Sequence, residues 1–142
     1  MLDVSVRAGI LNLLLDLKRD RQLSIVFITH DISTAGYMCD HIAVMYKGRV
    51  VEYGPKMDVI FKPRHPYTKS LIGVAMDLDY FLDQKDKFIR DGEVDSSVKT
   101  GYCAFIDRCV HSSESCSDNE GKGEKCELTE VAEGHFVACG NC

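Results

Sequence analysis

A histidine and an aspartate at the end of a short apolar run are the first residues in this chain that could do chemistry. The run from Leu23 to Thr29 is rich in β-branched residues, and His30 and Asp31 follow it directly. This pattern predicts a buried strand that presents an imidazole and a carboxylate at the edge of a sheet, where open α/β folds bind their ligands. Taken alone, the pattern is also typical of a histidine that only makes structural hydrogen bonds.

The second set of candidates consists of the six cysteines, of seven in the chain, that fall between Cys103 and Cys142. No N-terminal segment has the order of a secretory signal, so we expect a reducing compartment, where clustered thiols favour a metal site over crosslinks. Four thiolates can hold an iron–sulfur cluster or a tetrahedral zinc ion. Structural zinc ligands usually stand two to four residues apart, and only Cys139 and Cys142 have that spacing. The wider gaps favour the cluster, with zinc, or cysteines that are unligated or disulfide-bonded, as the alternatives.

Periodicity and turn residues predict the elements that would position these side chains. From Val4 to Arg21, apolar residues recur every three or four positions, which predicts an amphipathic helix with Asp3 or Ser5 at its N-cap. Two β-prone runs on either side of Lys47-Gly48 predict a hairpin, because glycine readily adopts a positive φ. The complete set of further predicted elements is a strand over 23–29, hairpin strands over 42–46 and 49–53, and helices over 32–40, 56–61 and 67–76.

Composition and charge limit the classes of function. The chain has 142 residues, 45% of them hydrophobic, and no apolar run near the roughly 20 residues that a membrane span needs. Residues 1–76 carry ten Lys and Arg against seven Asp and Glu, whereas residues 77–142 carry seven against fifteen. This shift suggests two units, and the acidic second half argues against a nucleic-acid partner. Residues 101–142 have too few apolar runs to form a core unless a crosslink, such as a bound metal or a disulfide, stabilises them.

In their order and spacing, the segments from Met1 to Leu71, resumed at Cys103, resemble the C-terminal part of the ATP-binding subunit of an oligopeptide or dipeptide ABC transporter. Leu2-Asp3 is similar to the end of that family's D-loop, Thr29-His30-Asp31 to its switch-histidine motif, and His65-Pro66-Tyr67-Thr68 to a signature of peptide importers. The resemblance implies an α/β fold. Residues 1–76 would be the C-terminal portion of a P-loop, RecA-like nucleotide-binding domain, residues 77–100 a linker, and residues 101–142 a small cysteine-rich extension.

The same resemblance assigns roles to individual residues. His30 would contact the γ-phosphate of ATP and the attacking water, with Mg²⁺ as the metal of the intact site. Asp3 and Asp31 would lie at the nucleotide site and the dimer interface, although Asp3 is equally well explained as a helix cap. The resemblance also implies a [4Fe-4S] cluster. Because nothing in the nearby sequence looks like a second cofactor site, we expect this cluster to stabilise the fold rather than to do redox chemistry. Its four ligands would be Cys103, Cys109, Cys116 and Cys139, which leaves Cys126 and Cys142 as extra cysteines.

Several motifs that an ATPase requires are not found in this sequence. It contains no G-x4-G-K-[ST] phosphate loop, no strand ending in the Asp-Glu pair that would hold magnesium, no glutamine loop and no Ser-Gly-Gly signature. We therefore expect no catalysis by this chain alone, and we expect it to be a piece of a longer subunit, such as a truncated or split gene product.

In an intact system, the resemblance implies a peripheral protein on the cytoplasmic face of the cell membrane. Its partners would be a second ATP-binding subunit, in a homodimer or heterodimer, and two membrane permease subunits. One alternative is a freestanding metal-binding or regulatory module that associates with transporter subunits without catalysis. Another is a redox enzyme using Cys139 and Cys142, which is disfavoured because no helix follows that could lower a thiol pKa.

Overall fold

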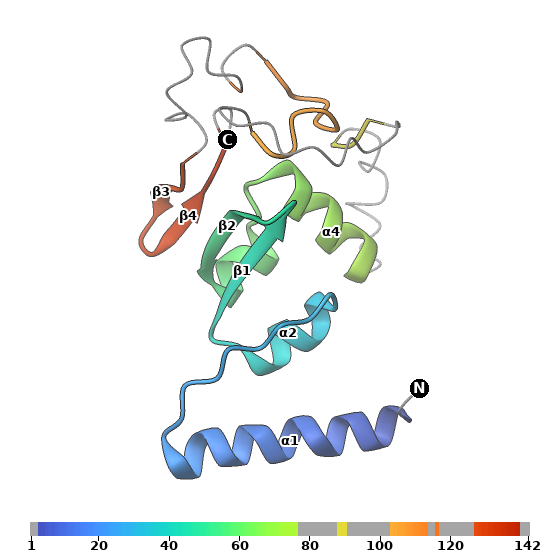
Figure 1. Cartoon of the computed structure of the whole chain (residues 1–142), viewed down its shortest axis with the longest axis vertical. Coiled ribbons are helices and arrows are strands. Elements are labelled where there is room, and N and C mark those ends of the chain that lie inside the picture. The colour runs from blue at the N-terminus through green and yellow to red at the C-terminus, as the bar shows by residue number, and fades with distance from the viewer. Residues whose placement is uncertain (1–2, 77–87, 91–102, 114–115, 117–126, 140–142) are drawn as a thin grey trace. The chain divides into compact units, whose positions relative to one another are not determined.

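The computed structural model describes residues 3–76, 88–90, 103–113, 116 and 127–139 (Figure 1). The described part contains both helices and strands, so the predicted mixture of helix and sheet is confirmed. The chain divides into two compact units, Met1–Cys39 and Asp40–Cys142. Among the described residues, no helix is both long enough and apolar enough to cross a membrane.

The first unit contains two helices, as the sequence predicts: α1 (Val4–Arg21) and α2 (Ile32–Met38). Three basic residues in the last turn of α1 stabilise the helix, because their positive charges lie at the negative end of the helix dipole. The helix ends at Gln22, which adopts the left-handed conformation with a φ of 52°. The hydroxyl of Tyr37 in α2 donates a hydrogen bond to Oδ1 of Asn12 in α1, at 2.5 Å.

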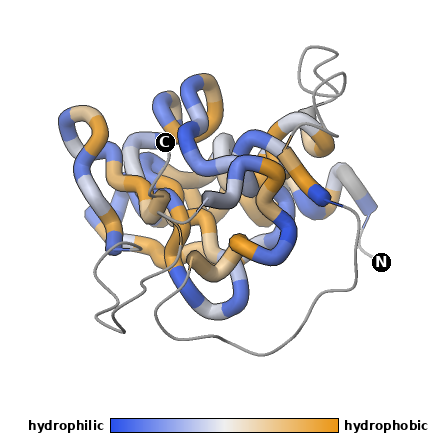
Figure 2. Tube along the Cα trace, turned by 90° about the horizontal axis from the view of Figure 1, so that it is seen from above, coloured by the Kyte–Doolittle hydropathy of each residue, from blue (hydrophilic) through white to orange (hydrophobic). Residues whose placement is uncertain are grey.

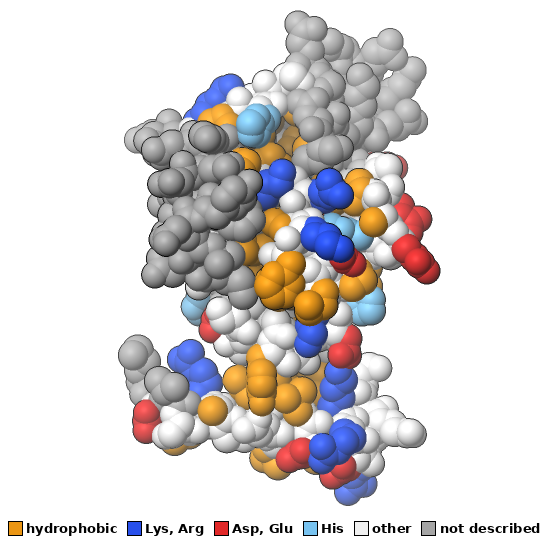
Figure 3. Space-filling view, turned by 180° about the vertical axis from the view of Figure 1, so that it is seen from behind, with side chains coloured by type: hydrophobic (Ala, Val, Ile, Leu, Met, Phe, Trp, Pro, Cys, Tyr) orange, Lys and Arg blue, Asp and Glu red, His pale blue; other side chains and the backbone are white. Residues whose placement is uncertain are grey.

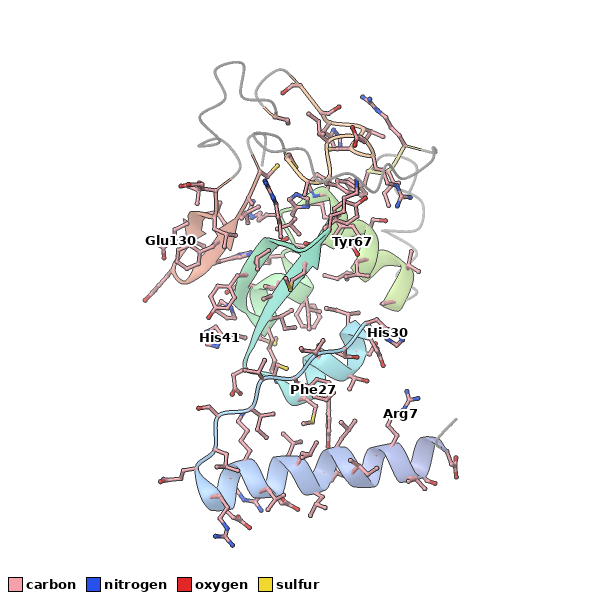
Figure 4. The ribbon with its side chains drawn as sticks, viewed as in Figure 1. Arg7, Phe27, His30, His41, Tyr67 and Glu130 are labelled. Carbon is pink, nitrogen blue, oxygen red and sulfur yellow. The ribbon has the colours of Figure 1, made fainter. Side chains whose placement is uncertain are left out.

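The prediction of a buried strand over residues 23–29 is wrong. These residues are extended but pair with no described strand, and the side chains of Val26 and Ile28 are each 92% exposed. The alternate side chains, Ile25 and Phe27, are half-buried, and Figure 4 shows Phe27 between α1 and α2. A strand forms only where a neighbouring strand satisfies its backbone hydrogen bonds. The described part of the chain offers no such neighbour, so one face of this apolar segment stays uncovered.

The second unit is built on a four-stranded antiparallel sheet with the order β1-β2-β4-β3. The predicted hairpin is confirmed as β1 (His41–Tyr46) and β2 (Arg49–Pro55). Lys47 and Gly48 in its turn have φ values of 46° and 76°, and two positive φ values are typical of the type I′ turn that suits a hairpin.

A second hairpin, which the sequence analysis did not predict, completes this sheet. It consists of β3 (Thr129–Ala132) and β4 (His135–Val137), joined by a turn in which Gly134 has a φ of 67°. Strand β4 pairs with β2 so that Val137 lies opposite Glu52. The backbone N–H of Ala138 then donates to the carbonyl of Val51 at 2.9 Å, which extends this pairing by one residue.

Two helices of the second unit follow the first hairpin, close to their predicted positions: α3 (Lys56–Phe61) and α4 (Pro66–Met76). Pro66 suits the first position of α4, where a backbone N–H is not needed. Val59 of α3, Ile72 of α4 and Val137 of β4 are buried almost completely. Figure 2 shows that apolar stretches alternate with hydrophilic ones along the described chain, and Figure 3 shows apolar, basic and acidic side chains interspersed on one face.

Candidate functional site

His30 lies at the end of the extended segment and directly before α2, where its side chain is exposed (Figure 4). The sequence places the imidazole there because Asp31 ends the extended segment and begins the helix. The hydroxyl oxygen of Thr29 accepts the backbone N–H of Asp31 at 3.0 Å, which fixes the turn around His30. The imidazole is thus accessible from outside the first unit.

The carboxylate of Asp31 caps the N-terminus of α2. It accepts hydrogen bonds from the backbone N–H groups of Ser33 and Thr34, at 2.9 and 3.3 Å, and from the Thr34 hydroxyl at 2.5 Å. The Thr34 hydroxyl is the main cause that holds the pKa of Asp31 below its ordinary value, and the two backbone N–H groups add to it. The charged Asp31 carboxylate therefore fixes the start of α2, immediately after His30 in the sequence.

Asp3 occupies the N-cap position of α1, one of the two positions that the sequence analysis proposed for this cap. Its carboxylate accepts a hydrogen bond from the Ser5 hydroxyl at 2.8 Å but makes no side-chain hydrogen bond to the backbone of the helix. The predicted role of Asp3 at a dimer interface stays a prediction.

The four cysteines that the sequence analysis singled out line one cavity of about 210 Å³ in the second unit. Cys103, Cys109 and Cys116 are buried thiols, and Cys139 is half-buried and disulfide-bonded. Within the described residues, no group of three or more His, Cys, Asp or Glu is arranged to hold a metal ion. The structure thus brings the four residues to one cavity without showing a metal centre, and Cys126 and Cys142 lie outside the described residues.

Short backbone hydrogen bonds shape the loop that carries three of these cysteines. The N–H of Cys103 donates to the carbonyl of Cys116 at 3.1 Å, which closes the loop, and the N–H of Cys109 donates to the carbonyl of Phe105 at 3.0 Å. Arg90 donates its N–H to the carbonyl of Arg108 at 2.7 Å. These hydrogen bonds bring the backbone of Cys103 beside that of Cys116 and place Cys109 at the end of a turn that begins at Phe105.

Phe105 packs this cysteine loop against the His65-Pro66-Tyr67-Thr68 segment. Its side chain is 1% exposed, and its ring centroid lies 5.8 Å from that of His65 and 5.5 Å from that of Tyr67. The ring of Tyr46 at the end of β1 contacts it edge-on at 5.2 Å. Figure 4 shows Tyr67 at the start of α4. Aromatic packing of this kind stabilises the contact beyond simple area burial.

Charged and titratable groups also line the cysteine cavity. Arg64 and Lys69 supply positive charge, and His65 and His111 supply imidazoles. Burial, with a smaller effect of Lys69, lowers the pKa of His65 to about 4, so this imidazole is neutral at pH 7. Burial raises the pKa of the Cys109 thiol, which stays protonated unless a cation binds it.

Glu52 of β2 is a buried carboxylate that the sequence analysis missed. Its Oε2 accepts the backbone N–H of His65 at 2.9 Å, and its Oε1 accepts that of Arg64 at 2.8 Å and lies 2.7 Å from Nε2 of His135. A glutamate between Val51 and Tyr53 gives no sequence signal, because strands alternate inward and outward residues and a charged one is expected to face water.

Comparison with protein families gives one match, to the family described as "Oligopeptide/dipeptide transporter, C-terminal region", over residues 51–116. Residues 51–116 are the C-terminal region of an oligopeptide/dipeptide transporter protein. The matched residues of this family region run from β2, with Glu52, through α4 to Cys116. They therefore include three of the four cysteines that line the cavity.

The curated proteins that the chain resembles are named as ATP-binding proteins. The chain is 37% identical to the dipeptide transport ATP-binding protein DppF of Haemophilus influenzae, over 97% of the chain and 41% of that protein. It is 43% identical to DppF of Escherichia coli, over 76% of the chain and 32% of that protein. A probable peptide ABC transporter ATP-binding protein of Sinorhizobium fredii is 38% identical, over 97% of the chain and 38% of that protein. The chain thus spans about two fifths of the length of the first of these relatives.

Proposed function

We propose that this chain acts as the C-terminal part of the ATP-binding subunit of a peptide importer, and that ATP hydrolysis requires a phosphate loop from another polypeptide stretch. The observation that carries the proposal is the position of His30, exposed at the end of an extended segment in a chain whose relatives are named ATP-binding proteins. Those names also favour this role over a freestanding metal-binding module.

His30 has the chemistry that phosphoryl transfer to water needs. A neutral imidazole has one N–H donor and one acceptor nitrogen, so it can donate to the γ-phosphate and accept a hydrogen bond from the attacking water. The hydrogen bonds of Asp31 and Thr29 hold the backbone on which His30 sits, next to the start of α2. In this role the orientation of the ring over the nucleotide matters more than its basicity.

The uncovered face of residues 23–29 supports the need for a second stretch of polypeptide. Val26 and Ile28 expose nearly their whole side chains, although strands of parallel sheets are apolar on both faces because both faces are covered. In the intact subunit, the remaining part of the nucleotide-binding domain would supply a neighbouring strand and cover these residues. The same part would bind ATP and Mg²⁺.

The setting that we propose for the subunit is the one that its resemblance to peptide-importer ATPases implies. Peptide import ATP-binding proteins would work in pairs, with a second ATP-binding subunit and two membrane permease subunits. The chain would lie on the cytoplasmic face of the membrane. The domain division that we propose for the intact subunit is 1–76, 77–100 and 101–142.

Three features of the cysteine cavity support the proposal of a metal centre, although the described side chains are not arranged to hold a metal ion in this structure. Four cysteine side chains line it, three of them are reduced, and Arg64 and Lys69 offset the negative charge that thiolates bring. We propose that, once a thiol reductant such as glutathione has supplied the two electrons and two protons that reduce the Cys139 disulfide to two thiols, Cys103, Cys109, Cys116 and Cys139 hold a [4Fe-4S] cluster. When bound, such a cluster would crosslink the loop 103–116 to the end of β4 as a structural staple.

Nucleotide binding tests the subunit proposal. The chain would be co-expressed with the part of the Haemophilus influenzae relative that it does not match, and the complex titrated with a fluorescent ATP analogue. We expect the complex to bind the nucleotide and the chain alone to show no saturable binding. Saturable binding by the chain alone, or a complex that forms but binds no nucleotide, would disprove the proposal.

Spectroscopy and metal analysis test the proposed cluster. The chain purified anaerobically is expected to be brown, with broad absorbance near 400 nm and about four iron atoms per chain. Cys109→Ser should remove most of the iron, whereas the matched variant Cys39→Ser, at a half-buried cysteine outside the cavity, should keep it. A colourless protein with one zinc ion per chain would disprove the cluster and support a zinc site instead. A reduced protein that contains no metal would exclude both the cluster and the zinc site.

A further inference from the structure

His65 is held from two sides in the interior of the second unit. Its side chain is 1% exposed. Its Nδ1 accepts a hydrogen bond from the backbone N–H of Tyr67 at 3.1 Å, and its Nε2 lies 4.0 Å from the sulfur of Cys103. The imidazole thus joins the start of α4 to the wall of the cysteine cavity.

The contact with Tyr67 decides which ring nitrogen carries the hydrogen. A backbone N–H is always a donor, so Nδ1 of His65 must be the acceptor and cannot carry a hydrogen. In the neutral imidazole, the hydrogen therefore lies on Nε2. Because Nε2 is the nitrogen that faces Cys103, the sulfur is the hydrogen-bond acceptor and the imidazole is the donor.

The backbone of His65 is fixed as firmly as its ring. Both oxygens of Glu52 accept backbone N–H groups from this segment, one from Arg64 and one from His65. The ring of Phe105 packs against the imidazole at a centroid distance of 5.8 Å. A ring that is fixed at its backbone, at Nδ1 and on its aromatic side keeps its Nε2–H directed at the Cys103 sulfur.

We propose that His65 is a positioning residue for Cys103, and that its Nε2–H donates a hydrogen bond to the Cys103 sulfur that favours metal binding by this thiolate. This inference extends the proposal of a metal centre made above and rests on that proposal. An N–H donor stabilises a thiolate and sets its orientation without adding a further charge to the cavity. Residues that orient metal ligands in this way typically change metal affinity by about 10- to 100-fold when they are replaced.

The first measurement uses the full chain, reduced and free of metal, and needs no ligand. In ¹⁵N spectra of the imidazole rings at pH 7, we expect His65 to be protonated at Nε2 and unprotonated at Nδ1. Protonation at Nδ1 would overturn the proposal whether or not the chain binds metal.

The second measurement is a titration of the reduced chain with Co²⁺ followed by sulfur-to-cobalt charge-transfer absorbance. We expect His65→Phe to weaken Co²⁺ binding by about 10- to 100-fold. His65→Gln, which keeps a side-chain N–H, should lose less, and the control His41→Phe, at an exposed histidine outside the cavity, should bind as the wild type does. Equal affinities in folded wild-type and His65→Phe chains would overturn the proposal.

The two measurements separate this inference from the metal proposal on which it rests. If the wild type binds no Co²⁺ while His65 carries its hydrogen on Nε2, the metal centre fails, and with it the metal-positioning role, but the hydrogen bond stands. If the wild type binds Co²⁺ and the tautomer is the other one, the metal centre stands and the role of His65 fails. Should His65→Phe not fold, His65→Gln and the wild-type spectra still decide.

Discussion

Glu52 and His135 are separated by 83 positions in the sequence and meet in the interior of the second unit, where Oε1 of Glu52 lies 2.7 Å from Nε2 of His135. Neither side chain is more than 2% exposed. The same carboxylate accepts the backbone N–H groups of Arg64 and His65. One buried residue of β2 therefore holds both the β3-β4 hairpin and the segment that leads into α4.

Removal of the Glu52 carboxylate should strongly destabilise the second unit. Glu52→Ala leaves the buried backbone N–H of His65, the part-buried N–H of Arg64 and the buried side chain of His135 without their acceptor, which costs about 3–5 kcal/mol. Urea unfolding followed by far-UV circular dichroism measures the loss.

A matched control for Glu52→Ala lies in the second hairpin. Glu130 is exposed and accepts the backbone N–H of Gly134 at 2.8 Å (Figure 4), so Glu130→Ala should cost at most about 1 kcal/mol. Equal unfolding midpoints for Glu52→Ala and Glu130→Ala would show that the buried contacts of Glu52 do not stabilise the fold.

The buried imidazole of His65 should make the stability of the reduced, metal-free chain depend on pH. Burial first, and Lys69 second, lower its pKa from 6.5 to about 4 in the folded chain. The unfolded chain therefore takes up this proton first as the pH falls below about 6.5, and the folded state loses stability down to about pH 4. The contribution is about 3 kcal/mol and is fully present above pH 6.5.

The difference between the wild type and His65→Gln isolates this contribution from other titrating groups. We expect the free energy of unfolding of the wild type to fall relative to that of His65→Gln between pH 6.5 and pH 4, and the difference to be constant above pH 7. A constant difference across the whole range would mean that His65 titrates normally in the folded chain.

Most helices and the first hairpin could be predicted because their signals are local. The apolar spacing from Val4 to Arg21 predicts α1, and Lys47-Gly48 suits a two-residue turn. The strand over 23–29 was predicted from the same kind of local signal and is wrong here, because the apolar run can form a strand only beside a partner strand. Its local pattern carries no information about that partner.

The rest of the second unit depends on contacts between residues far apart in the sequence. Strand β4 has three residues, too few for a periodic signal, and it is a strand because it pairs with β2 and buries His135. Glu52 is buried only because three donors surround it. The family motif predicts that Cys139 acts together with the other three cysteines. The cavity that the four residues share could not be predicted, because it depends on the pairing of β4 with β2.

The uncovered apolar face of residues 23–29 should be needed for assembly and not for the stability of the chain itself. Replacing Val26 and Ile28 by Lys should change the free energy of unfolding by at most about 0.5 kcal/mol, because both side chains are almost fully exposed. The same double variant should fail to co-purify with the part of the Haemophilus influenzae relative that lies outside the matched region.

The control for this double variant is Val74→Lys, which places a lysine at another exposed apolar residue, on α4. It should co-purify as the wild type does. Co-purification of the double variant at wild-type yield would mean that this face is not the surface that a neighbouring strand covers.

Steady-state ATP turnover by the complex of the chain with the unmatched part of the Haemophilus influenzae relative is the most direct test of the central claim. We expect the complex to hydrolyse ATP and the chain alone to show none. His30→Ala should lower kcat by about 100-fold or more while nucleotide affinity is kept, and His41→Ala should leave kcat unchanged. Wild-type kcat in the His30→Ala complex, or robust hydrolysis by the chain alone, would contradict the account.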